Sequence, residues 1–512
     1  MHMHTPRTGA PSALSGILRR FVRSRRGGVA LPFALTALPL TLLSLAAVDF
    51  NRASMVKSGL QDALDAATLT VGRSSTYTAD QVQSLGASTL AANLKAFPDT
   101  TLQSSTFTLD GNKVVAQAEV SVTPIVADMF GGGNLQVGAH SEVVRAVNKL
   151  EIAMVLDNTG SMAGTKLSTL KTAASNFVDT LSAAAARSSD PDAVKISLVP
   201  FSMTVNVGTA YRNATWIDQN AASPINDAIF SSHANRFTLL SQMGQSWGGC
   251  VESRQAPYDV QETAPDVNTP ATLFTPFFAP DEPDTYGYYN SYLSDGTSSS
   301  SWQTRQGNVA KYTGSPTRTG ANAVGYQYGP NAGCALQPLM RLTTDWSSLK
   351  TAINGMTAVG DTNIPMGLVW GWHALSPNTP FADGKAYGTD KLTKVVVLMT
   401  DGQNQETASG NSDDSFYSGL GYIWQNRLGI TSGTTSQRQA ALDARETAVC
   451  TNMKAKGIVI YTVRVEVNDT NYGTLKSCAS TPDKFYDVKS ASDLNAVFNA
   501  IAGAIQNLRI SH

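Results

Sequence analysis

A run of 20 residues without a charged side chain, from Val29 to Val48, constrains this chain more than any other feature of its sequence. At about 1.5 Å per residue, a helix of that length spans the roughly 30 Å hydrocarbon core of a bilayer. Residues 1–28 carry six arginines and no acidic residue. Because basic residues beside a membrane segment stay in the cytoplasm, the sequence predicts a cytoplasmic leader (1–28), a transmembrane helix (29–49) and export of everything that follows.

The alternative is a signal peptide that is removed after export. Residues 44–46, Ser-Leu-Ala, form an acceptable cleavage site. The apolar run, however, is longer than the roughly 7–15 residues of a signal-peptide core. Apolar residues also continue beyond it at helical spacing, at Val56, Leu60, Leu64, Ala67 and Val71. We therefore favour a retained anchor and keep the cleaved leader as the alternative.

Net charge and cysteines narrow the class of protein further. The formal net charge is −1, which argues against nucleic acid as the partner. No CxxC or HExxH motif is present in the sequence, so a zinc site is not expected. All four cysteines follow the apolar run, which predicts two disulfides in an exported domain. Three pairings are possible, and we favour the nearest-neighbour pairs, Cys250–Cys334 and Cys450–Cys478.

Residues 50–148 have the pattern of a small α+β module. The helix from the membrane continues to residue 73, and a second helical stretch ends near Pro98. Between residues 105 and 122, apolar and polar residues then alternate around a turn at residues 110–112 (Asp-Gly-Asn), which is typical of a β-hairpin. A further strand is predicted over residues 136–147.

From residue 149 to residue 512, strand-like and helix-like segments alternate. Short apolar runs of the kind found in doubly buried strands lie at residues 152–156, 195–201, 394–399, 457–463 and 485–488. Helices are predicted at residues 166–185, 365–374, 437–456 and 491–508. This order predicts an α/β domain with a doubly wound, mostly parallel sheet.

Residues 209–341 interrupt this alternation. They have weak periodicity, serine- and glycine-rich stretches and a concentration of tyrosines. A structureless loop of that length is uncommon, so we expect an inserted subdomain held by the Cys250–Cys334 disulfide. Its composition suits adaptable binding loops, although a passive surface excursion is an equal alternative.

Three polar segments are expected at the carboxyl edge of this sheet, where ligand sites of α/β folds form. Residues 157–161 follow one buried strand, residues 360–364 precede a helix, and residues 400–402 follow another strand. Two carboxylates and three hydroxyls are available as ligands: Asp157, Thr159, Ser161, Thr362 and Asp401. Oxygen ligands without sulfur or imidazole favour Mg²⁺ or Mn²⁺ over zinc.

Enzymatic alternatives fit these segments poorly. A haloacid-dehalogenase phosphatase needs D-x-D, but residue 159 is threonine, so the general acid is missing. An aspartic protease needs D-T-G, and Asn158 intervenes; no GxxxxGK[ST] phosphate loop is present. We therefore do not expect an enzyme. The remaining alternative to a metal site is that Asp157 and Thr362 only cap helices.

Taken together, the three segments resemble the metal-ion-dependent adhesion site of von Willebrand factor A domains. That family has D-x-[ST]-x-S after its first strand, a threonine on a second loop and Asp-Gly after its fourth strand. The resemblance covers residues 149–208 and 342–510, and the insertion departs from a compact A domain. It implies that Ser161, Thr159 and Thr362 bind the metal directly or through water, and that Asp157 and Asp401 are ligands or accept hydrogen bonds from bound water.

The N-terminal segment resembles the anchor of TadG-like proteins of tight-adherence (Flp) pilus assembly. The resemblance rests on the apolar run, on Ala47-Val48-Asp49-Phe50-Asn51-Arg52 and on the helix Leu60-Gln-Asp-Ala-Leu-Asp-Ala-Ala67. It implies a single-pass protein of the bacterial inner membrane with most of the chain in the periplasm. The expected partner is a protein that offers an acidic group, with pilus or secretion components as candidates. The alternative is a surface-exposed or secreted adhesin without a pilus.

Overall fold

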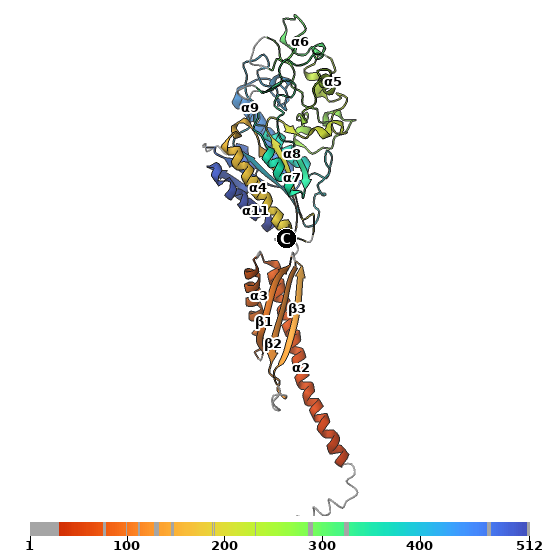
Figure 1. Ribbon diagram of the computed structural model, residues 1–512, viewed down its shortest axis with the longest axis vertical. Helices are drawn as coiled ribbons and strands as arrows, with labels where there is room; N and C mark the ends of the chain where they lie inside the picture. Colours follow the sequence, from red (N-terminus) through yellow and green to blue (C-terminus); the bar gives the residue numbers. More distant parts are fainter. Residues whose placement is uncertain are drawn as a thin grey trace, which may run out of the picture. The chain divides into compact units, whose positions relative to one another are not determined.

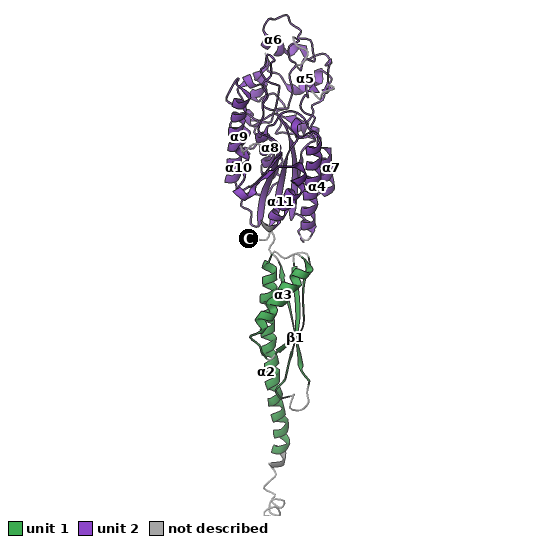
Figure 2. Ribbon diagram, turned by 90° about the vertical axis from the view of Figure 1, so that its left-hand side faces the viewer, with its two compact units in different colours: residues 1–145 green, residues 146–512 purple. Residues whose placement is uncertain are grey.

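The computed structural model describes residues 30–508, apart from 75–77, 99, 111–112, 127–132, 145–147, 187, 189, 231, 285–289, 322–326 and 468–472. The predicted cytoplasmic leader, 1–28, lies outside the described residues. The chain forms two compact units, residues 1–145 and 146–512 (Figure 2).

The first unit is built on one long helix, α2 (Ala30–Arg73). Its first part carries exposed apolar side chains such as Phe33, Leu38 and Leu43, whereas Leu60, Leu64 and others further on are buried. From Phe33 onward, the helix is long and apolar enough to cross a membrane. The predicted continuation of the apolar segment into a packed helix is therefore confirmed.

The packed part of α2 lies against a helix and a three-stranded antiparallel sheet. Helix α3 (Ala79–Leu94) begins at Thr78, whose hydroxyl accepts the Gln81 N–H. The sheet has the order β1-β2-β3 and consists of β1 (Thr100–Asp110), β2 (Lys113–Val122) and β3 (Leu135–Val144). Alternate apolar residues of β2 bury themselves against the helices, so the predicted hairpin is present.

The second unit is an α/β domain around an eight-stranded sheet (Figure 1). Its parallel strands lie in the order β13-β12-β11-β4-β5. Short antiparallel strands extend the sheet beyond β5: β6 (Val205–Asn206), β7 (Cys250–Val251) and β10 (Met340–Thr343). The parallel strands are β4 (Lys149–Asp157), β5 (Val194–Phe201), β11 (Leu392–Thr400), β12 (Val459–Val465) and β13 (Phe485–Val488). The predicted doubly wound, mostly parallel sheet is confirmed.

Helices cover both faces of this sheet because successive side chains of a strand point to opposite sides. In β4, Ile152 and Met154 join one apolar cluster, and Ala153 and Val155 join the other. The helices on the Ile152 side are α4 (Thr165–Ala186), α7 (Trp346–Gly355) and α11 (Leu494–Leu508). Those on the Val155 side include α8 (Ile364–Leu375) and α9 (Thr435–Ala455).

Helix α8 is buried along its whole length. It approaches the sheet closely at two glycines: a Cβ atom on Gly367 would lie 2.6 Å from the Phe201 ring, and one on Gly371 would lie 2.5 Å from Val155. Neither position has room for a larger residue. This close contact fixes the helix that begins directly after Thr362.

The predicted insertion, residues 209–341, has few regular elements. They include the short helices α5 (Arg236–Gln242) and α6 (Trp302–Gln306) and the strand pair β8 (Gly320–Ala321) and β9 (Gln327–Tyr328). Much of its apolar interior belongs to the cluster on the α8 face of the sheet: Trp216 and Phe274, for example, pack on Trp370 of α8. The insertion therefore continues the core of the domain.

Both predicted disulfides are present. Cys250 pairs with Cys334 across the insertion. Cys450 of α9 pairs with Cys478 of the short helix α10 (Gly473–Cys478). The nearest-neighbour pairing expected from the sequence is confirmed.

Candidate metal site

Asp157 is the last residue of β4 and is fully buried. Its Oδ1 accepts the Thr159 N–H at 2.7 Å, and its Oδ2 accepts the Thr400 hydroxyl at 2.6 Å. Thr400 ends the neighbouring strand β11. The carboxylate is therefore held in one orientation by both strands that meet at this edge.

The hydroxyls that follow connect Asp157 to the third predicted segment. Thr159 Oγ1 lies 2.9 Å from Ser161 Oγ, and Ser161 Oγ donates to Asp401 Oδ1 at 2.7 Å. Thr159 is 1% exposed, whereas Ser161 is exposed at the surface. The structure thus brings four of the five predicted residues into one hydrogen-bonded group.

The fifth residue, Thr362, lies on a loop that is hydrogen-bonded to the other two loops, the one after β4 and the one after β11. Gly160 N–H donates to the Gly360 carbonyl at 3.0 Å, and Gln405 N–H donates to the Thr362 carbonyl at 2.8 Å. Within the part of the chain that the structure describes, the Thr362 hydroxyl forms no hydrogen bond. It is 3% exposed and is available as an oxygen donor.

The electrostatics of this group favour a cation. Burial raises the pKa of Asp157 to about 6, and the Asp401 charge adds to the rise, while hydrogen bonds from Thr400 and Thr159 oppose it. Lys166 Nζ lies 2.6 Å from Asp401 Oδ2 and already supplies one positive charge. Since an opposite charge stabilises a buried carboxylate, a bound cation would favour the ionised form of Asp157.

Lys166 is the residue at this site that the sequence analysis missed. It lies in the first turn of α4, a helix with no acidic residue in that turn. A cation at a helix N-terminus is unfavourable unless an acid balances it. This placement marks Lys166 as unusual, but it does not identify Asp401 as the partner.

The donor set fits a hard divalent cation. Two carboxylates and three hydroxyls supply oxygen only, as Mg²⁺ and Mn²⁺ prefer. Lys166 shows that positive charge is accepted beside Asp401. Asp157, Thr159, Ser161, Thr362 and Asp401 are therefore the residues that would hold the metal.

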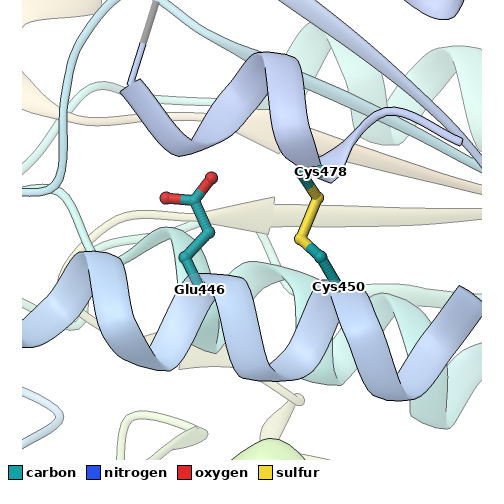
Figure 3. A group of neighbouring side chains, drawn as sticks. All are labelled: Glu446, Cys450 and Cys478. Carbon is teal, nitrogen blue, oxygen red and sulfur yellow. A yellow bond between two sulfur atoms is a disulfide. The ribbon is translucent and has the colours of Figure 1, made fainter. Parts of the chain in front are cut away.

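A second group with possible metal ligands does not form such a site. Among the described residues, Glu446, Cys450 and Cys478 bring ligand atoms within 4.8 Å of one another. Both sulfurs are joined in a disulfide (Figure 3), and only a free thiolate binds metal well. Glu446 instead accepts a hydrogen bond from the Asn404 amide at 2.6 Å.

Two further polar residues, one on α8 and one on the loop before it, are held by other contacts. His373 on α8 is fully buried between the rings of Phe274 and Trp370, and burial lowers its pKa well below the usual value. It therefore packs as a neutral side chain. Asp361 accepts the Thr407 N–H at 2.8 Å and is not part of the hydrogen-bonded group around Asp157.

Solved structures similar to this chain include two pilus proteins and a protein of the mussel byssus. The vWF domain of the type V pili tip protein Mfa5 from Porphyromonas gingivalis is 12% identical, with a TM-score of 0.33; the match covers 71% of this chain and 97% of that one. The pilus adhesin SpaC from Lactobacillus rhamnosus GG is 14% identical, with a TM-score of 0.30, and the match covers 80% of this chain and 34% of SpaC. Proximal thread matrix protein 1 of the mussel byssus, with a zinc-occupied MIDAS motif, is 13% identical, with a TM-score of 0.29 and coverage of 71% and 47%.

Likenesses with TM-scores this low carry no argument about function, and the fold rests on the sheet order described above. No curated protein matches this sequence. One family model does match, described as "Putative Flp pilus-assembly TadE/G-like", over residues 27–74. The predicted resemblance of the N-terminal segment to the TadE/G-like family is therefore confirmed over those residues.

Proposed function

We propose that this chain is a membrane-anchored envelope protein of Flp pilus assembly or anchoring that binds a protein partner through a divalent metal, Mg²⁺ or Mn²⁺. The observation that carries the proposal is the hydrogen bond from Ser161 to Asp401, two residues 240 positions apart in the sequence. It joins two of the three loops whose residue types suit a metal. The TadE/G-like match over residues 27–74 supports the link to a pilus.

The chain's own residues suit adhesion to an acidic group. Three of the five donors are uncharged hydroxyls, so a bound divalent ion would keep Lewis acidity for a carboxylate of the partner. Asp157 is buried and held by two hydrogen bonds, whereas Ser161 is exposed. The acidic group of the partner would therefore approach from the side of Ser161.

The proposed topology follows from helix α2. Its exposed apolar part would lie in the inner membrane, with the six arginines of the leader in the cytoplasm. Both units would then lie in the periplasm, where the two disulfides are stable. Fractionation tests this part: recovery with the inner membrane supports it, and release or surface exposure favours the adhesin alternative.

Calorimetric titration of the full chain in detergent with Mg²⁺ and Mn²⁺ tests the metal site. We expect saturable binding by the wild type and by Asp493→Ala, an exposed-residue control in the same unit. Asp157→Ala should weaken binding by at least about 100-fold, since losing an outer partner of a ligand already costs about 10–100-fold. Absence of binding by the wild type, or equal binding by Asp157→Ala, would contradict the metal site.

A further inference from the structure

Three carboxylates of the second unit form no ion pair with any of the residues that the structure describes. Glu282 is 2% exposed and Glu406 is 4% exposed, and Asp361 is half-buried. Within the described residues, none of the three forms an ion pair, whereas buried Asp281 and Glu252 pair with Lys311 and with arginines. Because a buried charge normally requires a partner, these three side chains need an explanation.

The three carboxylates line one cavity of about 210 Å³. The same cavity is lined by Val359 and Gly360 of the loop that leads to Thr362. Gly360 is exposed and lies two residues before Thr362. Among the described residues that line the cavity, none is lysine, arginine or histidine.

Glu406 has an oxygen left for a ligand. Its Oε2 accepts the Ser418 hydroxyl at 3.2 Å, and its Oε1 accepts no hydrogen bond from the residues that the structure describes. Burial raises the pKa of Glu406 to about 8, and the charge of Asp361 adds to the rise, opposed by Ser418 and Arg438. Burial likewise raises the pKa of Glu282 to about 8. A cation in the cavity would offset the free-energy cost of burying these two carboxylates in their ionised form.

The arrangement suits an organic cation better than a metal ion. Carboxylates that could share one ion would bring their oxygens within 4.8 Å of one another, and among the described residues these three do not. The walls also include Met203, Phe416 and Tyr417. Apolar and aromatic walls suit the alkyl stem and charged end of an ammonium group. The cavity volume is below the roughly 300–1,000 Å³ of drug-sized sites. It is therefore better matched to a single side chain than to a larger ligand.

We propose that this cavity binds a lysine side chain of the protein partner, with its ammonium group between Glu406, Glu282 and Asp361. The proposal deepens the proposed function, on which it rests for the existence of a protein partner. The partner would then present an acidic group to the metal and a lysine to the cavity next to it. A partner with two acidic groups, or with an uncharged side chain at either position, would fit only one of the two sites. The pair of contacts would therefore make binding specific.

Ligand-observed NMR with the full chain in detergent tests the proposal. The probe is Nα-acetyl-lysine methylamide at pH 8.5, and the uncharged control is Nα-acetyl-norleucine methylamide. We expect millimolar binding of the lysine probe and at least about tenfold weaker binding of the norleucine control, on the scale of a charged contact. Glu406→Gln and Glu282→Gln should each weaken lysine binding by about tenfold, whereas Glu119→Gln, an exposed residue of the first unit, should not.

EDTA in every sample of this series separates this test from that of the metal site, because lysine binding is then measured without divalent ions. Circular dichroism checks that each variant is folded, and the second glutamate variant covers the failure of the first. Equal affinity for lysine and norleucine probes, no binding by the wild type, or unchanged lysine binding in both folded glutamate variants would overturn the proposal. In a separate series without EDTA, displacement of the lysine probe by millimolar Ca²⁺ from the Asp157→Ala variant would also overturn it, in favour of a second metal.

Discussion

Strands β4 and β11 lie side by side, with Glu151 near one end of the pair and Asp157 and Asp401 at the other, but the two ends balance the charge differently. At their start, Glu151 is in register with Lys394, and the two form an ion pair. Both are buried, at 3% and 5% exposure. Beyond their other end, Asp157 and Asp401 lie close enough for the Asp401 charge to raise the pKa of Asp157.

Under the proposed function, this difference separates a structural charge from charges that would serve a ligand. Glu151 also accepts the Lys385 N–H at 2.9 Å, and Lys394 donates to the Leu375 carbonyl at 2.7 Å, so this end is complete within the chain. At the other end, only Lys166 balances Asp401, and the neighbouring Glu406 has no ion-pair partner among the described residues. Natural proteins retain such unfavourable clusters where binding requires them.

The largest effect is expected at the paired end. Lys394→Met removes the basic partner and leaves Glu151 buried, which costs about 3–5 kcal/mol in the free energy of unfolding. Arg341→Met is the matched control, because the Arg341–Asp383 pair is exposed at its arginine and exposed pairs contribute about 0–1 kcal/mol. Urea denaturation of the full chain measures both. An equal loss in the free energy of unfolding in the two variants would show that the Glu151–Lys394 pair contributes no more than an exposed pair.

The parallel part of the sheet could be predicted from the sequence because its strands are continuous apolar runs. The strand predicted at 152–156 lies within β4, and the helix predicted at 365–374 differs from α8 by one residue at each end. Strand β10 and helix α7 were missed. Four residues of β10 carry too little periodicity, and its pairing with β5 depends on a contact about 140 residues away.

The candidate site shows the same limit. Asp157 and Asp401 could be placed together because each follows a buried strand, and parallel strands end at one edge. The pairing of Lys166 with Asp401 spans 235 residues, and nothing in the local pattern specifies it. Glu282 and Glu406 come from the insertion and from an irregular segment after β11, so only tertiary packing brings them to one cavity.

An intermediate effect is expected from the pH dependence of stability at the unpaired end. Glu406 has a pKa of about 8 when folded and about 4.5 when unfolded, so the folded chain holds an extra proton between these values. The free energy of unfolding therefore falls as pH rises from 4.5 to 8, by up to about 1.4 kcal/mol per pH unit for this group. Glu406→Gln should flatten the fall and be more stable than the wild type at pH 8 by about 1–3 kcal/mol.

Denaturation at pH 5, 6, 7 and 8 measures this slope. Glu119→Gln serves as the control, because that side chain is exposed and should leave the slope unchanged. Curves for Glu406→Gln and the wild type that stay parallel across the range would show that Glu406 is already balanced. The end of the strands near Glu406 would then be balanced in charge, like the end that carries the Glu151–Lys394 pair.

The smallest effect is expected at Lys166, which pairs with Asp401 at the proposed metal site. Its ammonium group lies 2.6 Å from Asp401 Oδ2, with 27% of its side chain exposed, and it would compete there with a divalent cation. Lys166→Met should therefore tighten Mg²⁺ binding by about fivefold, which corresponds to roughly 1 kcal/mol for a partly exposed ion pair. Calorimetry on the full chain measures the change. The control is Lys171→Met, one turn further along α4, where a half-buried lysine donates to the Asn354 carbonyl and not to a carboxylate. Weaker Mg²⁺ binding in Lys166→Met would mean that the lysine holds Asp401 in position for the metal, so that this end of the sheet, like the end at Glu151, depends on a base supplied by the chain.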